Sequence, residues 1–360
     1  MNPAFWQGRR VFLTGHTGFK GAWLAAWLTQ MGAEVTGFAH PPESEPNLWA
    51  LLALSDVRSV TADINDRAAL EQTLTEVQPE AVIHLAAQSL VRRSYRQPVE
   101  TFATNVLGVV NLLDAVRACE SVRGVVIATS DKAYENSHQI WGYRETDPMG
   151  GYDPYSGSKG AAEIAAAAMR RSFFHPQAAL GHQAGIACVR AGNVIGGGDW
   201  AEDRLVPDIV RGCLGSSGAV ILRAPHSIRP WQHVLEPLRG YLMVAEKLCS
   251  GEPGFDEGWN FGPKREDERA VIDVAEALVQ AIGKGRIGID PAAANVHEAA
   301  LLTLDATKAR ARLGWQPVLD FADCIRLTSD WYGGWAAGRN PGQLCAEQIA
   351  EYAHRCAKTG

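Results

Sequence analysis

The feature that most constrains the fold of this chain is a glycine loop near its beginning. The apolar stretch Arg10–Gly15 runs into the segment TGHTGFKG (14–21). Apolar residues then recur at helical spacing over Phe19–Met31. Glycine lets a backbone turn tightly and approach a pyrophosphate, and the helix that follows presents free N–H groups to it. Glycines spaced G-x-x-G-x-x-G between a first strand and a helix therefore predict a dinucleotide-binding unit.

Short apolar stretches alternate with helical patterns over the first half of the chain. Strands are expected at Glu34–Ala39, Val57–Ile64, Ala81–Ala87, Gly124–Ser130 and Gly185–Val194, and helices at Arg67–Val77, Pro98–Cys119 and Pro154–Phe174. Strands that read as continuous apolar runs are typical of parallel sheets covered on both faces. The pattern predicts an α/β fold with a Rossmann-type doubly wound parallel sheet, formed by residues 1–195 and carrying the catalytic residues.

The pattern changes after about Gly196, where turn residues cluster. Helices are expected at Leu205–Leu214, Val234–Cys249 and Val271–Ile282, with a short strand at Ala219–Arg223. We interpret residues 196–360 mainly as a smaller C-terminal substrate-binding lobe, from which segments near Trp259–Phe261 return to the large domain. The tail after about Ala336 is expected to be helical.

Composition limits the classes of partner. The formal net charge is −6 and no basic run is concentrated, so nucleic acid is not an expected partner. The longest apolar stretches are judged too short and too interrupted to span a bilayer. The chain enters a strand almost at once, without a signal peptide, and its seven cysteines lack CxxC spacing. We therefore expect a cytoplasmic protein with reduced thiols and no metal site.

The glycine loop and the strand ends beside it supply the candidate cofactor contacts. The acidic residue that usually follows the second strand is missing, so a choice between NAD and NADP is not visible there. Asp63, next to Ile64, either touches the adenine amino group or caps its own loop. Small residues after the fourth strand let a cofactor lie close to the sheet, and can pack the core as well. The candidates are Gly15, Thr17, Gly18, Phe19, Lys20, Asp63, Ile64, Leu85, Ala86 and Ala87.

Tyr155 and Lys159 form the candidate catalytic pair. They stand four residues apart at the start of a predicted helix, so their side chains share one face. A phenol has a pKa of about 10, and a nearby ammonium group favours the phenolate and lowers that value. The same lysine can bind the nicotinamide ribose. The pair follows a strand ending in Thr129-Ser130, and this arrangement predicts hydride chemistry on a carbinol.

The glycine loop, Thr129-Ser130 and Tyr155/Lys159 together resemble the extended short-chain dehydrogenase/reductases over most of the chain. The resemblance implies that Ser130 helps to hold the substrate and that Thr129 lies beside the cofactor. It also implies that Asn105 binds the cofactor or supports the lysine through water. From the residues alone, Asn105 could equally be a polar helix residue satisfied by packing.

Asp131 and Lys132 narrow the resemblance. An added ionisable pair at this strand end suggests a second proton transfer, and it is similar to the sugar-nucleotide 4,6-dehydratases, most of which carry Asp-Glu here. Asp-Lys resembles the branch that acts on CDP-glucose, as do PMGGYDPYSGSKG (148–160) and RPWQHVLEPLRGYL (229–242). The resemblance implies NAD as cofactor, CDP-glucose as the sugar-nucleotide partner, and a place in deoxysugar biosynthesis for O-antigen and other cell-surface polysaccharides.

The mechanism implied by the resemblance uses three ionisable side chains. Tyr155 takes the C4 hydroxyl proton, Lys132 removes the C5 proton, and Asp131 protonates the departing C6 hydroxyl. Lys132 must then be neutral, and Asp131 needs a raised pKa to keep its proton. The two roles can be divided otherwise, and the alternative to a catalytic role is that Asp131 and Lys132 form an ordinary surface ion pair.

Candidate substrate contacts follow the last predicted strand of the sheet. Asn193 ends that strand at the carboxyl edge, where ligands bind in open α/β sheets. The resemblance implies that Asn193 holds the diphosphate or sugar and that Arg229 binds phosphate. Arg204, Leu205 and Arg223 are expected on the nucleotide side. Trp200 packs either over the sugar or base, or in the core.

Other functions share part of this pattern. An epimerase or another 4,6-dehydratase carries the same loop and the Tyr155/Lys159 pair, a decarboxylase is not excluded, and a non-catalytic nicotinamide sensor uses the same fold. In the family, helices such as Pro98–Cys119 and Pro154–Phe174 pair between subunits, so a homodimer or homotetramer is expected. The alternative is that these helices pack within one chain.

Overall fold

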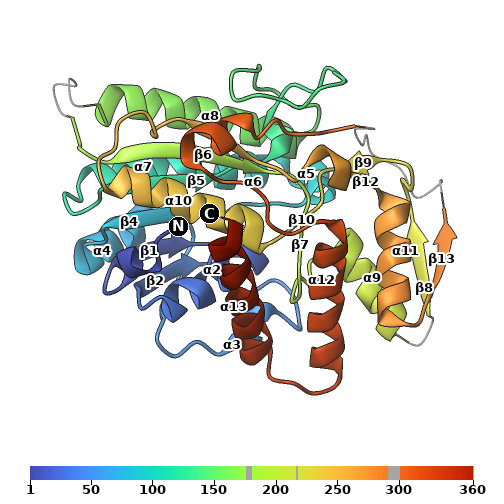
Figure 1. The fold of residues 1–360 in the computed structure, drawn as a ribbon. Helices are drawn as coiled ribbons and strands as arrows, with labels where there is room; N and C mark the ends of the chain where they lie inside the picture. The colour runs from blue at the N-terminus through green and yellow to red at the C-terminus, as the bar shows by residue number, and fades with distance from the viewer. Residues whose placement is uncertain (176–180, 216–217, 291–300, 360) are drawn as a thin grey trace.

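The computed structural model describes residues 1–175, 181–215, 218–290 and 301–359, and its centre is a parallel sheet of seven strands (Figure 1). The strand order is β11-β6-β5-β4-β1-β2-β3. The chain order reverses between β1 and β4, which is where doubly wound sheets bind ligands. The Rossmann-type fold is confirmed. The strands are β1 (Arg10–Thr14), β2 (Glu34–Ala39), β3 (Arg58–Thr61), β4 (Ala81–His84), β5 (Gly124–Ala128), β6 (Gly185–Ala191) and β11 (Gly258–Phe261).

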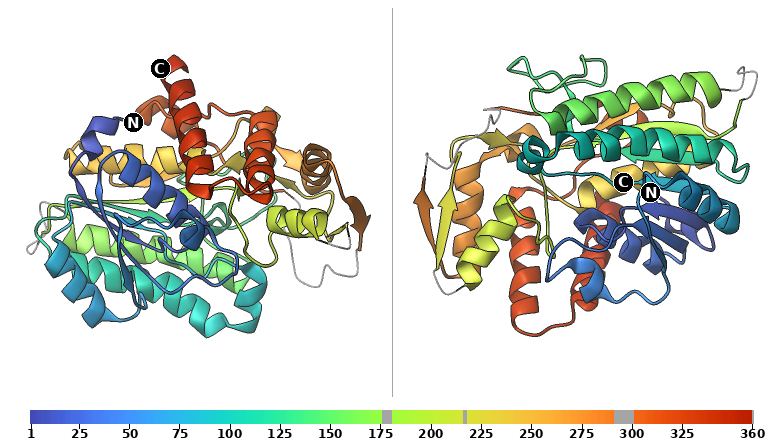
Figure 2. Two further views of the ribbon diagram at one scale, coloured as in Figure 1. Left: turned by 90° about the horizontal axis from the view of Figure 1, so that it is seen from below. Right: turned by 180° about the vertical axis from the view of Figure 1, so that it is seen from behind.

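Helices cover both faces of the sheet (Figure 2). Alternate side chains of β1 enter two separate cores, because Val11 and Leu13 pack with α2 and α10 while Phe12 packs with α4, α7 and α8. Both faces are therefore buried, as the continuous apolar strands predict. These helices are α2 (Phe19–Gln30), α4 (Arg67–Val77), α7 (Gly108–Arg117), α8 (Pro154–Phe173) and α10 (Leu235–Cys249).

The helix predicted at Pro98–Cys119 differs from expectation. It consists of α6 (Pro98–Phe102), a π-helical turn at Ala103–Leu107 and α7, and it is preceded by the unpredicted helix α5 (Val91–Arg96). By length and composition, Pro98–Arg117 could cross a membrane, with 20 residues and a mean hydropathy of 1.3, so the expectation that every apolar stretch is too short is wrong. Almost half of this stretch, 44%, is buried against the rest of the protein.

The start of α8 fixes the place of Tyr155. Asp153 precedes the helix, and its side chain accepts a hydrogen bond of 3.0 Å from the backbone N–H of Ser156. Pro154 occupies the first helical position, where a missing N–H costs nothing. The cap therefore begins the helix immediately before Tyr155.

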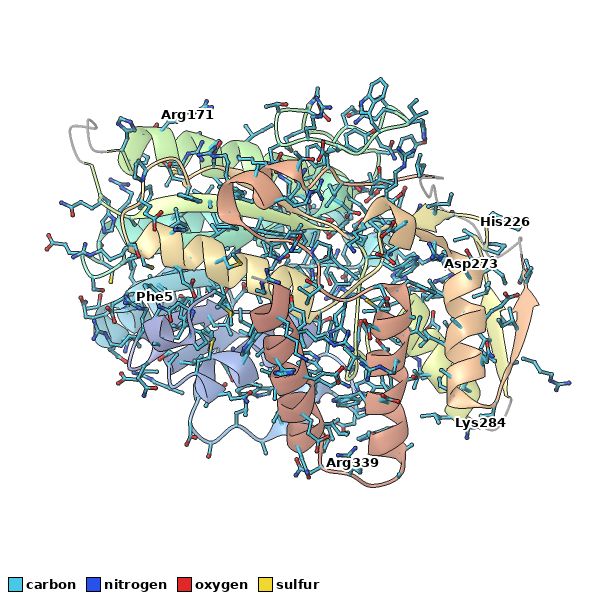
Figure 3. All side chains as sticks on the ribbon, in the orientation of Figure 1. Phe5, Arg171, His226, Asp273, Lys284 and Arg339 are labelled. Atoms are coloured by element: carbon cyan, nitrogen blue, oxygen red, sulfur yellow. The ribbon has the colours of Figure 1, made fainter. Side chains whose placement is uncertain are left out.

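A second group of elements lies beside the sheet. It contains α9 (Leu205–Leu214), α11 (Val271–Ile282) and the parallel pair β8 (Ala219–Leu222) and β13 (Arg286–Ile289). His226, Asp273 and Lys284 lie in this part of the molecule, and Arg339 lies in the turn between the last two helices (Figure 3). Those helices are α12 (Phe321–Ala336), which was not predicted, and α13 (Pro341–Thr359), which accounts for the helical tail.

Several late segments return to the sheet. β11 pairs with β6 at the sheet edge, in the place expected for Trp259–Phe261. α10 packs on the sheet, since a side chain at Gly124 or Gly185 would meet Leu248. α13 packs on α2, where the ring centroids of Tyr352 and Trp27 are 5.7 Å apart. The remaining short helices and strands are α1 (Pro3–Trp6), α3 (Leu48–Leu52), β7 (Val194–Ile195), β9 (Ile228–Arg229), β10 (Gln232–His233) and β12 (Arg269–Ala270), with 3-10 turns at Asp131–Ala133 and Arg265–Asp267 and a second π-helical turn at Ala309–Leu313.

Candidate active site

The glycine loop has the backbone geometry that a dinucleotide requires. Gly15 has a φ of +75°, and a Cβ there would lie 2.6 Å from the backbone nitrogen of Ala86. A side chain at Gly21 would collide with the carbonyl oxygen of Gly15. Gly18 precedes α2 and supplies no side-chain cap, so the first N–H groups of that helix remain available to an anion. These features fit the pyrophosphate of a dinucleotide cofactor.

The loop near β2 and β3 shows how Asp63 is used. Its Oδ1 accepts a hydrogen bond of 2.8 Å from the backbone N–H of Asn65, and its Oδ2 lies 3.3 Å from His40 Nε2. Asp63 thus caps its own loop, while a contact with adenine stays a prediction. Thr17 Oγ1 donates to the carbonyl oxygen of His40 at 2.8 Å, which ties the glycine loop to the end of β2. Ile64 is buried and packs against Gly108.

Lys20 contributes a cation to the space beside the catalytic pair. Burial, together with the positive charges of Arg204 and Lys159, lowers its pKa to about 8. The carboxyl groups of Asp131 and Asp199 act in the opposite direction. The cofactor loop and the catalytic residues therefore share one electrostatic environment.

Tyr155 and Lys159 are both buried on the first turns of α8. Lys159 Nζ donates to the carbonyl oxygen of Ala128 at 3.3 Å, and the backbone N–H of Tyr155 donates to Ser94 Oγ at 3.1 Å. Burial lowers the pKa of Lys159 to about 8, while the carboxylate of Glu163 raises it. The ammonium group is thus held at the end of β5, beside Thr129.

The pKa of Tyr155 moves opposite to the expectation. Burial raises the pKa of this phenol to about 12, although a hydrogen bond with Ser130 lowers it. The charge of Asp131 raises it further, and that of Arg204 lowers it. The loss of hydration outweighs the favourable charges, so proximity to Lys159 alone does not give a low pKa.

Ser130, Asp131 and Lys132 form a short segment directly after β5. Asp131–Ala133 is a single turn of 3-10 helix, and Ser130 Oγ both donates to Asp131 Oδ1 at 2.9 Å and accepts from the backbone N–H of Lys132 at 3.2 Å. Asp131 is only 3% exposed. Burial raises its pKa, while the charges of Lys132 and Arg229 lower it. The raised pKa matches the expectation for a group that must keep a proton.

Asn105 lies in the π-helical turn, and its side chain is fully engaged within the chain. Its Oδ1 accepts from the backbone N–H of Gln88 at 2.9 Å, and its Nδ2 donates to Gln88 O at 3.0 Å and to Ser158 Oγ at 2.8 Å. Asn105 therefore joins the segment after β4 to the first turns of α8, which agrees with the packing alternative. Leu85, Ala86 and Ala87 lie in that segment, and the backbone N–H of Ala86 donates to Thr14 Oγ1 at 3.2 Å.

Two of the three arginines predicted to bind the substrate, Arg204 and Arg229, act electrostatically on the catalytic residues. Arg229 is buried, and its charge lowers the pKa of Asp131. Arg204 lies 3.3 Å from Asp199 and donates to Ser89 Oγ at 2.8 Å, directly before Leu205 begins α9. Arg223 is farther along the chain and pairs with Asp203 at 2.7 Å. Arg204 and Arg229 are thus both coupled electrostatically to the catalytic residues.

Two other predicted residues have clear surroundings. The backbone oxygen of Asn193 accepts from the N–H of Gln232 at 3.0 Å, which holds the strand end beside the segment that carries Arg229. Trp200 is buried, and its ring centroid lies 4.8 Å from that of Trp335 and 5.3 Å from that of Tyr332. Of the two positions that the sequence left open for Trp200, the structure shows the one in the core.

Sequence reasoning missed residues that hold the site together. Ser94 orients the first turn of α8, Ser89 and Asp199 hold Arg204, and Glu163 lies behind Thr129 and Lys159. Single Ser, Asp and Glu residues are common in any sequence, so they do not by themselves indicate a site. Only Glu163 carried a signal in advance, because it stands four residues after Lys159 and so one helical turn farther along.

Three comparisons place this geometry among known proteins. The profile of the family described as GDP-mannose 4,6 dehydratase matches residues 12–328. The protein called CDP-glucose 4,6-dehydratase of Salmonella typhimurium is 48% identical over 349 residues, which cover 97% of this chain and 97% of that protein. The probable dTDP-glucose 4,6-dehydratase of Sinorhizobium fredii is 27% identical and covers 91% of this chain and 94% of its own length.

Solved structures share the fold at lower identity. A dTDP-glucose 4,6-dehydratase from Bacillus anthracis, in complex with NAD, superposes with a TM-score of 0.76 at 20% identity and covers 93% of this chain and 100% of its own. A UDP-glucose 4-epimerase from Thermotoga maritima, with UDP-glucose, gives a TM-score of 0.77 at 21% identity, over 91% of this chain and 99% of its own. Dehydratases and epimerases therefore share this architecture, and the fold alone does not separate them.

Proposed function

We propose, from the premise that the chain belongs to the GDP-mannose 4,6-dehydratase family, that it catalyses the NAD-dependent dehydration of CDP-D-glucose. The product is CDP-4-dehydro-6-deoxy-D-glucose, so the enzyme is a hydro-lyase of deoxysugar biosynthesis. The relative of 48% identity carries the name of this activity and matches almost the whole chain. Its identity supports the choice of CDP-glucose over other sugar nucleotides.

One observation carries the proposal: a buried carboxyl group with a raised pKa stands beside the Tyr155 and Lys159 pair. Asp131 Oδ2 has no hydrogen-bond partner among the described residues, and Asp131 Oδ1 is held by Ser130. A buried acceptor without a partner costs roughly 1–3 kcal/mol, so its retention favours a functional role. Oxidation at C4, in which Tyr155 takes only the hydroxyl proton, does not require this group, whereas the loss of water requires an acid.

NAD, when bound along the glycine loop, would accept a hydride from C4 of the sugar and return it to C6. The first proton transfer belongs to Tyr155, whose hydroxyl is hydrogen-bonded to Ser130. A phenol with a pKa of about 12 must be activated before it takes a proton at neutral pH. The charge of Arg204 lowers that pKa, and we infer that Lys159 and Lys20, further cations of the same site, help to stabilise the phenolate.

The second chemical step belongs to the segment after β5. Once C4 is a ketone, the C5 hydrogen is acidic, and we infer that Lys132 removes it as a base. Asp131, whose pKa is raised by burial, would give a proton to the departing C6 hydroxyl, and C5 would regain a proton from Lys132 when the hydride adds to C6. Ser130 bonds both the carboxyl group of Asp131 and the backbone N–H of Lys132, so it fixes that carboxyl group relative to the backbone of the segment.

The arginines would hold the nucleotide diphosphate. Arg229 is buried next to the catalytic segment, and Arg204 is anchored by Asp199 and Ser89 with its charge felt at Tyr155. A guanidinium group can bind a diphosphate through two parallel hydrogen bonds. We infer that Asn193 and Leu205 line the same side of the substrate site and that Arg223 contributes nearer the base.

A direct assay tests this function. Purified protein is incubated with CDP-glucose, and the sugar nucleotide is followed by mass spectrometry, with dTDP-, GDP- and UDP-glucose assayed in parallel. The expected result is loss of one water from CDP-glucose at a rate above those of the other three. The matched control is Tyr155→Phe, which keeps the ring and removes the hydroxyl, and should abolish conversion. If CDP-glucose stays unchanged while one of the other three sugar nucleotides loses water, the nucleotide of the substrate must be reassigned.

The quaternary state and location are part of the same proposal. We infer a homodimer or homotetramer, built through the exposed apolar side chains of α6, the π-helical turn and α8. Val99 is 82% exposed, Leu107 56% and Ile164 62%, all on the outer side of the helical layer. If these helices of two subunits pack against each other there, the three side chains become buried. We infer that the enzyme is cytoplasmic and has no membrane partner.

A further inference from the structure

The segment that carries Ser130, Asp131 and Lys132 is attached at both of its ends to one buried ion pair. At its start, Thr129 Oγ1 donates a hydrogen bond of 2.5 Å to Glu163 Oε1. At its end, the hydroxyl of Tyr134 accepts a hydrogen bond of 2.5 Å from Arg190 Nη1. Glu163 and Arg190 bond each other, so the two ends of the segment are joined through a single pair of side chains.

The ion pair itself is rigid and almost free of solvent. Arg190 Nε lies 2.7 Å from Glu163 Oε1, and its Nη2 donates to Glu163 Oε2 at 2.8 Å. The two side chains are 4% and 6% exposed. Two parallel hydrogen bonds fix both position and orientation. Glu163 comes from α8 and Arg190 from β6, so the pair also connects the catalytic helix to the sheet.

The network continues on the far side of Tyr134. The Tyr134 hydroxyl donates to Asn260 Oδ1 at 2.8 Å, and Asn260 Nδ2 donates to the carbonyl oxygen of Tyr143 at 2.8 Å. Asn260 is fully buried on β11. The end of the catalytic segment is thereby anchored to a third element, and each polar group of the network has a partner.

The oxidation machinery is held by different contacts. The first turn of α8 is fixed by Ser94 and by the Asp153 cap, and Lys159 donates to the carbonyl oxygen of Ala128. None of these hydrogen bonds includes Arg190 or Tyr134. A change at Tyr134 therefore releases the end of the segment that bears Asp131 and Lys132 while the anchors of Tyr155 and Lys159 remain.

We propose that Glu163 and Arg190, acting through Thr129 and Tyr134, are positioning residues for the elimination step. They form a clamp that holds the acid and the base of Asp131 and Lys132 in register with Tyr155. A buried ion pair is by itself weak support for stability, because desolvation offsets its attraction. Its attachment to both ends of one catalytic segment gives it a role in the reaction. This inference rests on the proposed function.

The test uses conservative variants of two residues of the clamp. Tyr134→Phe removes the hydroxyl that joins Arg190 to Asn260, and Arg190→Lys keeps the charge but loses the planar group that bonds Glu163 and Tyr134 together. In single turnovers with CDP-glucose, the ultraviolet absorbance of NADH reports C4 oxidation, and quenched samples report dehydrated product. Both variants should form product about tenfold more slowly, equal to about 1.4 kcal/mol in the barrier. NADH should appear at a nearly unchanged rate and accumulate.

Tyr143→Phe is the matched control. Tyr143 is also a buried tyrosine and stacks on Tyr134 with ring centroids 5.3 Å apart, but its hydroxyl bonds Asn136 and Ser137 instead of the ion pair. It should not accumulate NADH. Equal slowing of both steps in the two clamp variants, or the same accumulation in Tyr143→Phe, would overturn the clamp. Failure of the unmodified enzyme to dehydrate CDP-glucose would instead overturn the proposed function. Thermal unfolding of each variant checks that it is folded, and Arg190→Lys tests the clamp if Tyr134→Phe does not fold.

Discussion

Asp131 brings stability and chemistry into conflict at a single residue. Burial raises its pKa in the folded protein, whereas an unfolded aspartate has a pKa of about 3.9. Between those two values the folded state binds more protons than the unfolded state, so stability falls as pH rises through the folded pKa. The ionised form of Asp131 therefore destabilises the folded protein at pH values above its folded pKa.

Asp131→Asn should remove this destabilisation of the folded state and should also abolish water loss. We expect the variant to melt about 2 °C higher than the parent at pH 8, from relief of roughly 1 kcal/mol of desolvation. The difference should diminish as pH falls and vanish below the unfolded pKa of about 3.9, where the carboxyl group is protonated in both states. Calorimetry at the two pH values measures it. A lower melting temperature for the variant at pH 8 would contradict the assignment of Asp131 as a destabilising buried acid.

Lys132 is expected to act only after C4 is oxidised. Lys132→Ala should slow product formation by about a hundredfold, the usual contribution of a general base, with a much smaller effect on NADH appearance. Lys264→Ala is a suitable control, because Lys264 is an exposed lysine paired with Glu266 at 3.8 Å. Rapid-mixing absorbance compares the two variants. Equal loss of both steps in Lys132→Ala would argue against a base role in elimination.

The chemically distinctive residues were accessible from the sequence because their signal is local. Tyr155 and Lys159 share a helix face by spacing alone, and Asp131-Lys132 follow a recognisable strand. The pKa of Tyr155 was not accessible, since it depends on burial by side chains from distant segments. Glu163 and Arg190 are 27 positions apart and meet only because α8 and β6 pack together.

At the scale of elements, the glycine loop requires glycine for two separate reasons, its backbone conformation and its close approach to a neighbouring segment. Gly15 needs a positive φ and also needs empty space, because its Cβ would lie 2.6 Å from Ala86 N. Gly8 has a similar φ of +67° with nothing within 4 Å of a Cβ. The two positions thus share the backbone strain and differ in the close approach.

Gly15→Ala should therefore weaken NAD binding by more than about tenfold, since the loop must shift away from β4. Gly8→Ala should cost only the strain of a left-handed residue, about 1 kcal/mol of stability, and leave NAD affinity unchanged. Titration calorimetry with NAD, together with melting temperatures, compares the two. Equal NAD affinities in both variants would mean that close approach at Gly15 does not shape the cofactor site.

The strands and most helices of the sheet could be predicted because their apolar periodicity is strong. The π-helical turn at Ala103–Leu107 could not, since it depends on how Asn105 bonds Gln88 and Ser158, two residues from other segments. α12 was also missed, because Gly333 and Gly334 weaken its helical pattern while packing of Trp331 and Tyr332 in the core compensates.

At the scale of the whole molecule, the outer helical layer is the proposed subunit interface. Val99→Glu combined with Ile164→Glu would place charges where apolar contact is expected, and should convert the assembly to monomers. Ile289→Glu is the control, because Ile289 is also exposed, at 54%, but lies on β13 in the smaller lobe. Light scattering after size-exclusion chromatography gives the masses. An unchanged mass in the double variant would exclude this face as the interface.

The central claim is that one active site oxidises C4, eliminates water across C5 and C6, and returns the same hydride. Turnover of CDP-glucose in heavy water, followed by NMR of the product, tests all three steps together. We predict one solvent deuterium at C5, delivered or exchanged by the acid–base pair of Asp131 and Lys132, and none derived from solvent in the hydride returned to C6. Solvent deuterium at C6, or an unlabelled C5, would contradict this account.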